Sequence, residues 1–300
     1  MRHDMYKQKK IVIGAALMLL LAGIYIGIQY YVDRSATDLV DRALEKASAF
    51  AEIQYKDLTV DLFKRRFRLE KIRLSPKFFD DKIIIDDLTL HQGNKGSKTA
   101  ENIHVQVNGI RIDPAHPGGV LKPVLRDVGY ENIRINLELN GSYDAEKQIL
   151  EITHLKAGAE QVAEAELRLR LENINLDQIQ TVPNNLLVLL TMVSGVSIAG
   201  AELNYRDTSL LKKIYESEAR RKGQTVNAYV QSLTGGIKDM LRNETDPQTK
   251  QILNSIHDFL LAPDAISILI KPKRPVSVFS LYWAQTPSRL IKILGVEVSI

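Results

Sequence analysis

After residue 52 the chain shows two hydrophobic patterns, a strand-like repeat over residues 53–205 and a mainly helical spacing after Tyr205. Between residues 53 and 205 the chain repeats an eight-residue pattern of apolar, polar, apolar, two polar, apolar, polar and apolar positions. Alternation of apolar and polar positions gives a strand one apolar face. The clean copies of the pattern begin at Ile53, Phe67, Val105, Val128, Leu150 and Leu169, and two looser copies begin at Ile83 and Val196. The pattern therefore predicts a domain of repeated strands over residues 53–205.

Each clean copy contains a pair of consecutive polar residues, such as Lys56-Asp57 or Asn108-Gly109. In a regular strand this pair would move the following apolar residues to the other face. A β-bulge or a tight corner at the pair restores the original facing. We therefore expect a curved, mostly antiparallel sheet with one apolar and one polar face. The apolar face would either be covered by helices or form a β-groove that holds lipid.

The period becomes helical after Tyr205, and short strands follow near the end of the chain. Helices are predicted over residues 208–222, 225–242, 248–261 and 287–293, and strands over residues 265–270 and 296–300. An apolar strand at a terminus favours docking into the sheet. We expect a helical cap over residues 206–300 with its terminal strands docked on the sheet. The fold class predicted for the whole chain is α+β.

Residues 11–32 carry no charge. At 1.5 Å per residue a helix of this length spans about 33 Å, which is enough to cross a bilayer. The segment ends at Asp33-Arg34-Ser35, which is a poor cleavage site for a signal peptide. We therefore predict an uncleaved transmembrane helix over residues 11–32 and an amphipathic linker helix over residues 33–52. The basic residues 1–10 would form a cytoplasmic tail.

Two further apolar features have alternative interpretations. Gly23 and Gly27 have the GxxxG spacing that packs transmembrane helices together, although small residues also occur in ordinary spans. Residues 186–201 are apolar but interrupted by polar residues. A short buried helix that runs into a strand fits them better than a membrane-embedded segment, because they are short for a span.

The charge of the chain is a weak guide to its partners. The formal net charge is +4, and three of these four charges lie in residues 1–10. The remainder of the chain is nearly neutral, so nothing favours nucleic acid as a partner. The chain has no cysteine, which excludes disulfides, cysteine nucleophiles and thiolate metal sites.

Motifs for catalysis are missing from the sequence. The six histidines form neither HxH nor HExxH, and the chain has no GxSxG, Walker A or strand-following GxGxxG motif. We therefore assign no catalytic, metal or cofactor site and expect a protein that is not an enzyme.

The sharpest basic cluster is Lys64, Arg65, Arg66 and Arg68. It is a candidate contact for anionic lipid head groups, or the tip of a hairpin.

The order of these segments resembles a known group of bacterial envelope proteins. The basic tail, the anchor, the amphipathic helix and the strands of "IQYKDLTVDLFKRRFRLEKIRLS" resemble the AsmA-like superfamily. The later segment "KPKRPVSVF" is similar to the C-terminal parts of YdgA-like single-pass proteins. The resemblance implies a bacterial inner-membrane protein whose residues 33–300 lie in the periplasm. It also implies a link to phospholipid transport and outer-membrane maintenance.

The sequence therefore supports two hypotheses for the function. The first is a membrane-anchored periplasmic protein that binds a phospholipid or another amphiphile in its β-groove, in envelope maintenance or lipid transport. The second is a non-catalytic scaffold or adaptor subunit of an envelope or secretion complex. The few repeats favour local lipid binding or an adaptor role over a bridge across the periplasm.

Overall fold

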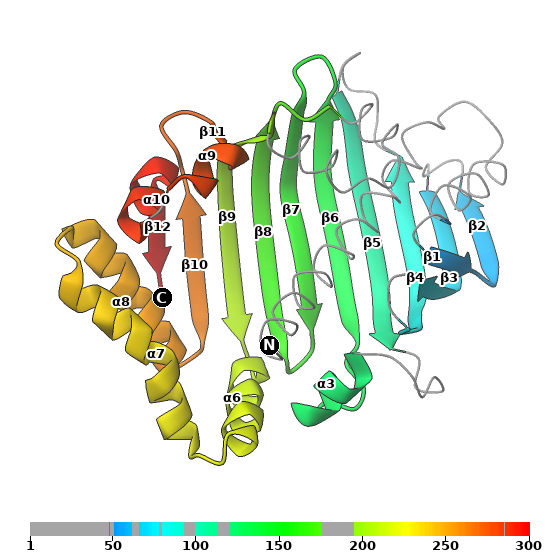
Figure 1. Cartoon of the computed structure of the whole chain (residues 1–300). Helices are drawn as coiled ribbons and strands as arrows, with labels where there is room; N and C mark the ends of the chain where they lie inside the picture. The colour runs from blue at the N-terminus through cyan, green and yellow to red at the C-terminus, as the bar shows by residue number, and fades with distance from the viewer. Residues whose placement is uncertain are drawn as a thin grey trace.

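The structure is a computed structural model in which twelve strands form one broad sheet (Figure 1). It describes residue 48 and residues 51–61, 66–77, 80–92, 100–112, 121–175, 195–284 and 286–300. The strands are β1 (Ala51–Gln54), β2 (Asp57–Asp61), β3 (Arg66–Pro76), β4 (Ile83–Gln92), β5 (Ala100–Ile112), β6 (Ile135–Asp144), β7 (Ile149–Ala159), β8 (Ala163–Glu172), β9 (Ser197–Asp207), β10 (Ala265–Ile270), β11 (Val276–Ser277) and β12 (Val296–Ser299). The helices are α3 (Leu121–Asp127), α6 (Leu210–Arg221), α7 (Val226–Asn243), α8 (Pro247–Leu261), α9 (Val278–Tyr282) and α10 (Pro287–Leu294).

The sheet is a meander in which neighbours in sequence are neighbours in space. Its strand order is β1-β3-β4-β5-β6-β7-β8-β9-β10-β12, and every pairing is antiparallel. The short strand β2 also pairs with β3, and β11 pairs with β9. Loops therefore leave the sheet alternately at two opposite ends. The helices α9 and α10 lie at one of these ends, and α3 lies at the other (Figure 1).

The predicted fold class is wrong, because it divided the protein into a transmembrane helix, a β-groove and a helical cap. Strands β10 and β12 come from the last hundred residues and extend the same sheet beyond β9, where the sequence predicts that the terminal strands dock. Helices α6 and α7 pack chiefly on neighbouring helices, and α8 packs on α7, on β12 and, through Phe259, on Tyr205 of β9. Among the described residues these three helices therefore meet the sheet near β9 and β12. The parts of the chain that the structure describes include no helix with the length and apolar character needed to cross a bilayer.

Several predicted segments fall partly or wholly outside the described residues. The predicted span 11–32, with Gly23 and Gly27, lies outside them. The linker helix predicted over residues 33–52 lies mostly outside them, and its last two positions belong to β1. Of the segment 186–201, the structure describes the part from residue 195, where β9 begins at Ser197.

The polar pair of the repeat is where the strands bend, as the sequence predicts. In β3 Lys71 has a φ of 53°, and in β5 Gly109 has a φ of 69°. The register shifts between Val107 and Ile110 in β5, and between Ile152 and Leu155 in β7. The extra residue at each pair keeps the apolar positions before and after it on the same face. At Lys56 the chain breaks instead into β1 and β2.

One clean copy of the repeat is not a strand. The copy that begins at Val128 follows α3, and residues 128–134 belong to turns and irregular structure. Gly129 takes a φ of 78° directly after the helix, which ends it in the left-handed conformation. Only Ile135, the last apolar position of the copy, enters a strand.

The predicted elements of the last hundred residues are confirmed. Helices α6, α7, α8 and α10 lie within two residues of the predicted bounds, and β10 has the predicted bounds. Side-chain caps explain where the helices begin. Thr225 accepts a hydrogen bond from the Ala228 amide in α7, and Asp246 accepts one from the Thr249 amide in α8.

Candidate functional site

An apolar row crosses the whole sheet. One apolar side chain from each of nine neighbouring strands pairs in register with the next. At about 4.8 Å between strands, the row is about 38 Å long. Its members are Phe67, Leu90, Val105, Leu139, Leu155, Leu167, Leu203, Ile268 and Val298. The apolar row defines the apolar face of the sheet.

Burial along this face is uneven. Over β3 to β6 it forms a hydrophobic core in which Leu69, Val107 and Leu137 are buried. This buried row continues over β7 to β9 as Ala157, Ala165 and Tyr205, which are only half-buried. The apolar row itself is half-buried at every position except Val105. Beside the row, Leu137 is followed by Ala157 in β7 and Ala165 in β8, which fill less space. Because these two side chains are small, we expect the face to be lower over β7 and β8 than over β6.

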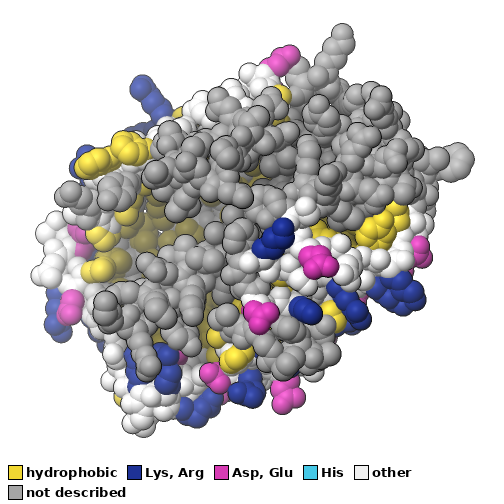
Figure 2. Space-filling view, turned by 45° about the vertical axis from the view of Figure 1, so that its right-hand side comes forward, with side chains coloured by type: hydrophobic (Ala, Val, Ile, Leu, Met, Phe, Trp, Pro, Cys, Tyr) yellow, Lys and Arg dark blue, Asp and Glu magenta, His cyan; other side chains and the backbone are white. Residues whose placement is uncertain are grey.

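An aromatic contact marks where a helix meets this face. The rings of Tyr205 in β9 and Phe259 in α8 lie edge to face with centroids 6.0 Å apart. The Tyr205 hydroxyl donates a hydrogen bond of 2.6 Å to Asp207 Oδ1. Burial raises the pKa of Tyr205, and the hydrogen bond to Asp207 and its charge raise it further, so the hydroxyl stays a donor. Figure 2 shows hydrophobic side chains lining a hollow in the molecular surface.

The opposite face of the sheet is polar and held by ion pairs. Arg168 in β8 lies 3.3 Å from Glu166 and 3.5 Å from Glu202 in β9. Lys156 in β7 lies 2.8 Å from Glu164 in β8, and this contact raises the pKa of Lys156. These groups pair with one another across strands, so the charges of Lys156 and Arg168 are balanced by neighbouring glutamates on the polar face.

Sequence reasoning missed a histidine pair on the polar face. His91 in β4 and His104 in β5 are opposite each other, with ring centroids 4.5 Å apart. His104 Nδ1 also contacts Asn140 Oδ1 in β6. Burial lowers the pKa of His91, and the neighbouring His104 and Arg66 lower it further. A search for motifs along the chain could not find this pair, because thirteen positions separate the two residues.

The predicted basic cluster is only partly described. Arg66 begins β3, and Arg68 lies 3.3 Å from Glu70 and 3.5 Å from Asp87, while Lys64 and Arg65 lie outside the described residues. Arg68 thus belongs to the ion-paired polar face. Its role in contacting lipid head groups stays a prediction.

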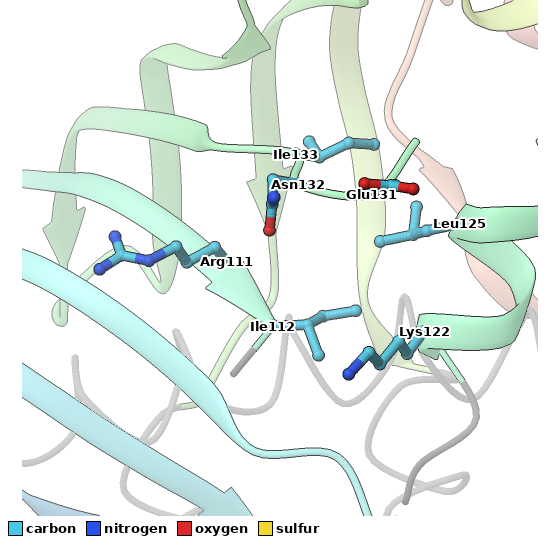
Figure 3. Close-up of a pocket in the computed structure, with 7 residues that line it drawn as sticks. All are labelled: Arg111, Ile112, Lys122, Leu125, Glu131, Asn132 and Ile133. Carbon is cyan, nitrogen blue, oxygen red and sulfur yellow. The ribbon is translucent and has the colours of Figure 1, made fainter. Parts of the chain in front are cut away.

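A small pocket lies where β5, α3 and residues 131–133 meet (Figure 3). Arg111, Lys122 and Glu131 contribute charged groups to its lining, together with apolar side chains from Leu125 and Ile133. Arg111 is already bound to Asp86 by an ion pair of 2.5 Å. The pocket is too small for an organic substrate. Among the residues that the structure describes, no three histidine, cysteine or acidic side chains are grouped to hold a metal ion.

Two comparisons with other proteins find relatives. A family model described as "Uncharacterized protein" matches residues 156–300, which run from β7 to the C-terminus. An "Uncharacterized protein" from Aquifex aeolicus (strain VF5) is 20% identical over 280 residues, which are 89% of this chain and 90% of the relative. Neither the family model nor the Aquifex protein has a described activity. Neither match links the chain to AsmA-like or YdgA-like proteins.

Proposed function

We propose that the protein is a non-catalytic binder of a lipid or another amphiphile in the bacterial cell envelope. The observation that carries this proposal is the apolar row, which stays half-buried over β7, β8 and β9. A continuous apolar surface of this kind favours a ligand with a long apolar part. The half-buried stretch lies among Leu155, Leu167 and Leu203, with Ala157 and Ala165 beside them.

The charge distribution supports the same proposal. The two faces of β8 differ completely, since Ala163, Ala165 and Leu167 alternate with Glu164 and Glu166. An acyl chain on the apolar face would leave the ion pairs of the polar face intact. Sequence motifs for catalysis are missing as well, so binding alone accounts for this arrangement.

A variant that fills the low part of the apolar face tests the proposal. Ala165→Phe would occupy space beside Leu167, and we expect the purified full-length protein to retain at least fivefold less lipid. The matched control is Glu164→Phe, which places the same ring on the same strand but on the polar face. Mass spectrometry of organic extracts gives the amount of each lipid per mole of protein. Equal lipid content in the two variants, or no lipid in the unmodified protein, would contradict the proposal.

A second candidate function is the scaffold or adaptor role, which one feature of α7 favours. Val226, Leu233 and Met240 are exposed at seven-residue intervals. This spacing places the three side chains on one side of the helix, where an apolar helix of another protein could pack. The lipid measurement separates the two candidates. If the protein acts only as a scaffold through α7, Ala165→Phe should not lower its lipid content.

A further inference from the structure

The C-terminal part of the chain combines basic and aromatic residues without any acid. Between Asp264 and Glu297 there are five basic residues and no acidic one. Three of the five, Lys271, Lys273 and Arg274, are exposed in the loop between β10 and β11. Lys292, a fourth basic residue of the stretch, lies 3.0 Å from Asp246, so the excess of positive charge is concentrated in the loop that carries Lys271, Lys273 and Arg274.

Two large aromatic side chains are exposed in the same stretch. Phe279 is 54% exposed and Trp283 is 56% exposed. Their rings meet edge to face with centroids 6.0 Å apart. Exposure of such a pair is costly in water, and Trp is the residue that most favours the interface between lipid and water.

The fold holds this stretch in place at one end of the sheet. Val276 pairs with Ile198 of β9, and the Val278 amide donates a hydrogen bond of 2.9 Å to the Val196 carbonyl oxygen. The Lys271 amide donates a hydrogen bond of 3.3 Å to the Gly295 carbonyl oxygen, which joins the basic loop to the end of α10. Figure 1 shows α9, α10 and the loop after β10 together at this end, opposite α3.

We propose that this basic–aromatic end, formed by residues 271–275 and α9, docks on the surface of an anionic phospholipid bilayer. The lysine and arginine side chains would contact the head groups, while Phe279 and Trp283 enter the interfacial layer. Charge complementarity selects this partner, because bacterial membranes are rich in anionic lipid and the stretch has no acid to oppose it. Docking would bring one end of the sheet to the membrane, independently of what the apolar face binds.

The chain offers a site-specific reporter, because Trp283 is its only tryptophan. Full-length protein is titrated with preformed vesicles of phosphatidylcholine alone or with one third phosphatidylglycerol. With phosphatidylglycerol we expect the Trp283 emission to shift to shorter wavelength and to be quenched by bromine-labelled lipid. Attachment through any other part of the chain does not produce this change. Raising the salt to 1 M should weaken it, since the screening length falls to about 3 Å.

Removing charge gives the quantitative test. Lys273→Ser combined with Arg274→Ser should raise the amount of anionic lipid needed for half of the emission change about thirtyfold, since each basic side chain near the surface contributes about 1 kcal/mol. The matched control is Lys122→Ser combined with Arg126→Ser on α3, which removes the same charge from the opposite end of the sheet. The proposal is overturned if Trp283 does not respond to phosphatidylglycerol, or if both double variants lose the response equally. Ala165→Phe should leave the response unchanged, so this test and the test of lipid binding can fail separately.

Discussion

At the scale of single residues, Gly295 occupies a position where the backbone leaves no space for a side chain. It caps α10 with a φ of 58°, in the left-handed region that favours glycine. A Cβ atom added to it would lie 2.3 Å from the carbonyl oxygen of Lys271. This oxygen belongs to the backbone and cannot turn aside as a side chain could. Gly295 therefore allows the end of α10 to approach the basic loop.

We expect Gly295→Ala to destabilise the protein by about 3 kcal/mol, from the left-handed backbone and the clash together. Gly223→Ala is the matched control, because Gly223 has a φ of 63° but no atom within 4 Å of an added Cβ. The control should cost only about 1 kcal/mol. Urea unfolding followed by circular dichroism measures both. Equal losses would show that the contact with Lys271 does not matter.

At the scale of elements, the strands separate their apolar and polar side chains onto two faces. Each bend in a strand keeps the apolar row on one side and leaves the cross-strand polar pairs on the other. His91 and His104 show the consequence for β4 and β5. The register that aligns Leu90 with Val105 also places the two histidine rings together.

The lowered pKa of His91 predicts that the stability of the protein depends on pH. The pKa of His91 is lowered in the folded protein, so folding favours the neutral ring over the charged one. Its contribution to stability is complete above about pH 6.5, the value for an unfolded histidine, and is lost as the pH falls through the lowered value. We expect His91→Gln to reduce the fall in melting temperature between pH 7.5 and pH 5. His257→Gln on α8 is the control, and an equal reduction in both variants would contradict the assignment.

Sequence periodicity identified most elements but not their partners. Apolar residues at helical spacing predicted α6, α7, α8 and α10, and the apolar run at residues 265–270 predicted β10. These patterns are local in the sequence, so they do not depend on which elements pair. Helix α3 was missed, since it has only seven residues and contains Pro123. The copy of the repeat that begins at Val128 was wrongly predicted as a strand, because Gly129 permits a turn that the apolar spacing does not reveal.

The candidate site could be predicted only in outline. The repeat indicated that an apolar face exists, but its continuity over nine strands depends on the registers and their shifts. Whether helices cover the face depends on where α6 to α8 pack, and their own stripes are equally compatible with packing on one another. The pairing of His91 with His104 likewise follows from register alone.

At the scale of the whole molecule, the sheet has two unequal halves. The half around β3 to β6 contains the buried cluster that includes Leu69, Leu88 and Leu137. The half around β7 to β9 is held by the same backbone pairing, but its apolar side chains are less buried. We infer that the apolar side chains over β3 to β6 contribute more to stability than the half-buried ones over β7 to β9.

Two leucine truncations test this division. Leu137→Ala in the buried half should destabilise the lipid-free protein by about 3 kcal/mol, because it removes fully buried groups and leaves a cavity. Leu155→Ala, on the neighbouring strand, should cost about 1 kcal/mol. Chemical denaturation measures both. A larger loss for Leu155→Ala would show that the second half is packed as tightly as the first.

The meander order of the sheet also has a consequence for how the chain reaches its native state. From β3 to β10 each strand pairs with the one made just before it. Contacts between near neighbours in sequence require little loop closure, which speeds folding. When a strand is synthesised, the strand that it pairs with has therefore already been made. The sheet can grow strand by strand in the order of translation as far as β9, and β10 and β12 join it after α6, α7 and α8 have been made.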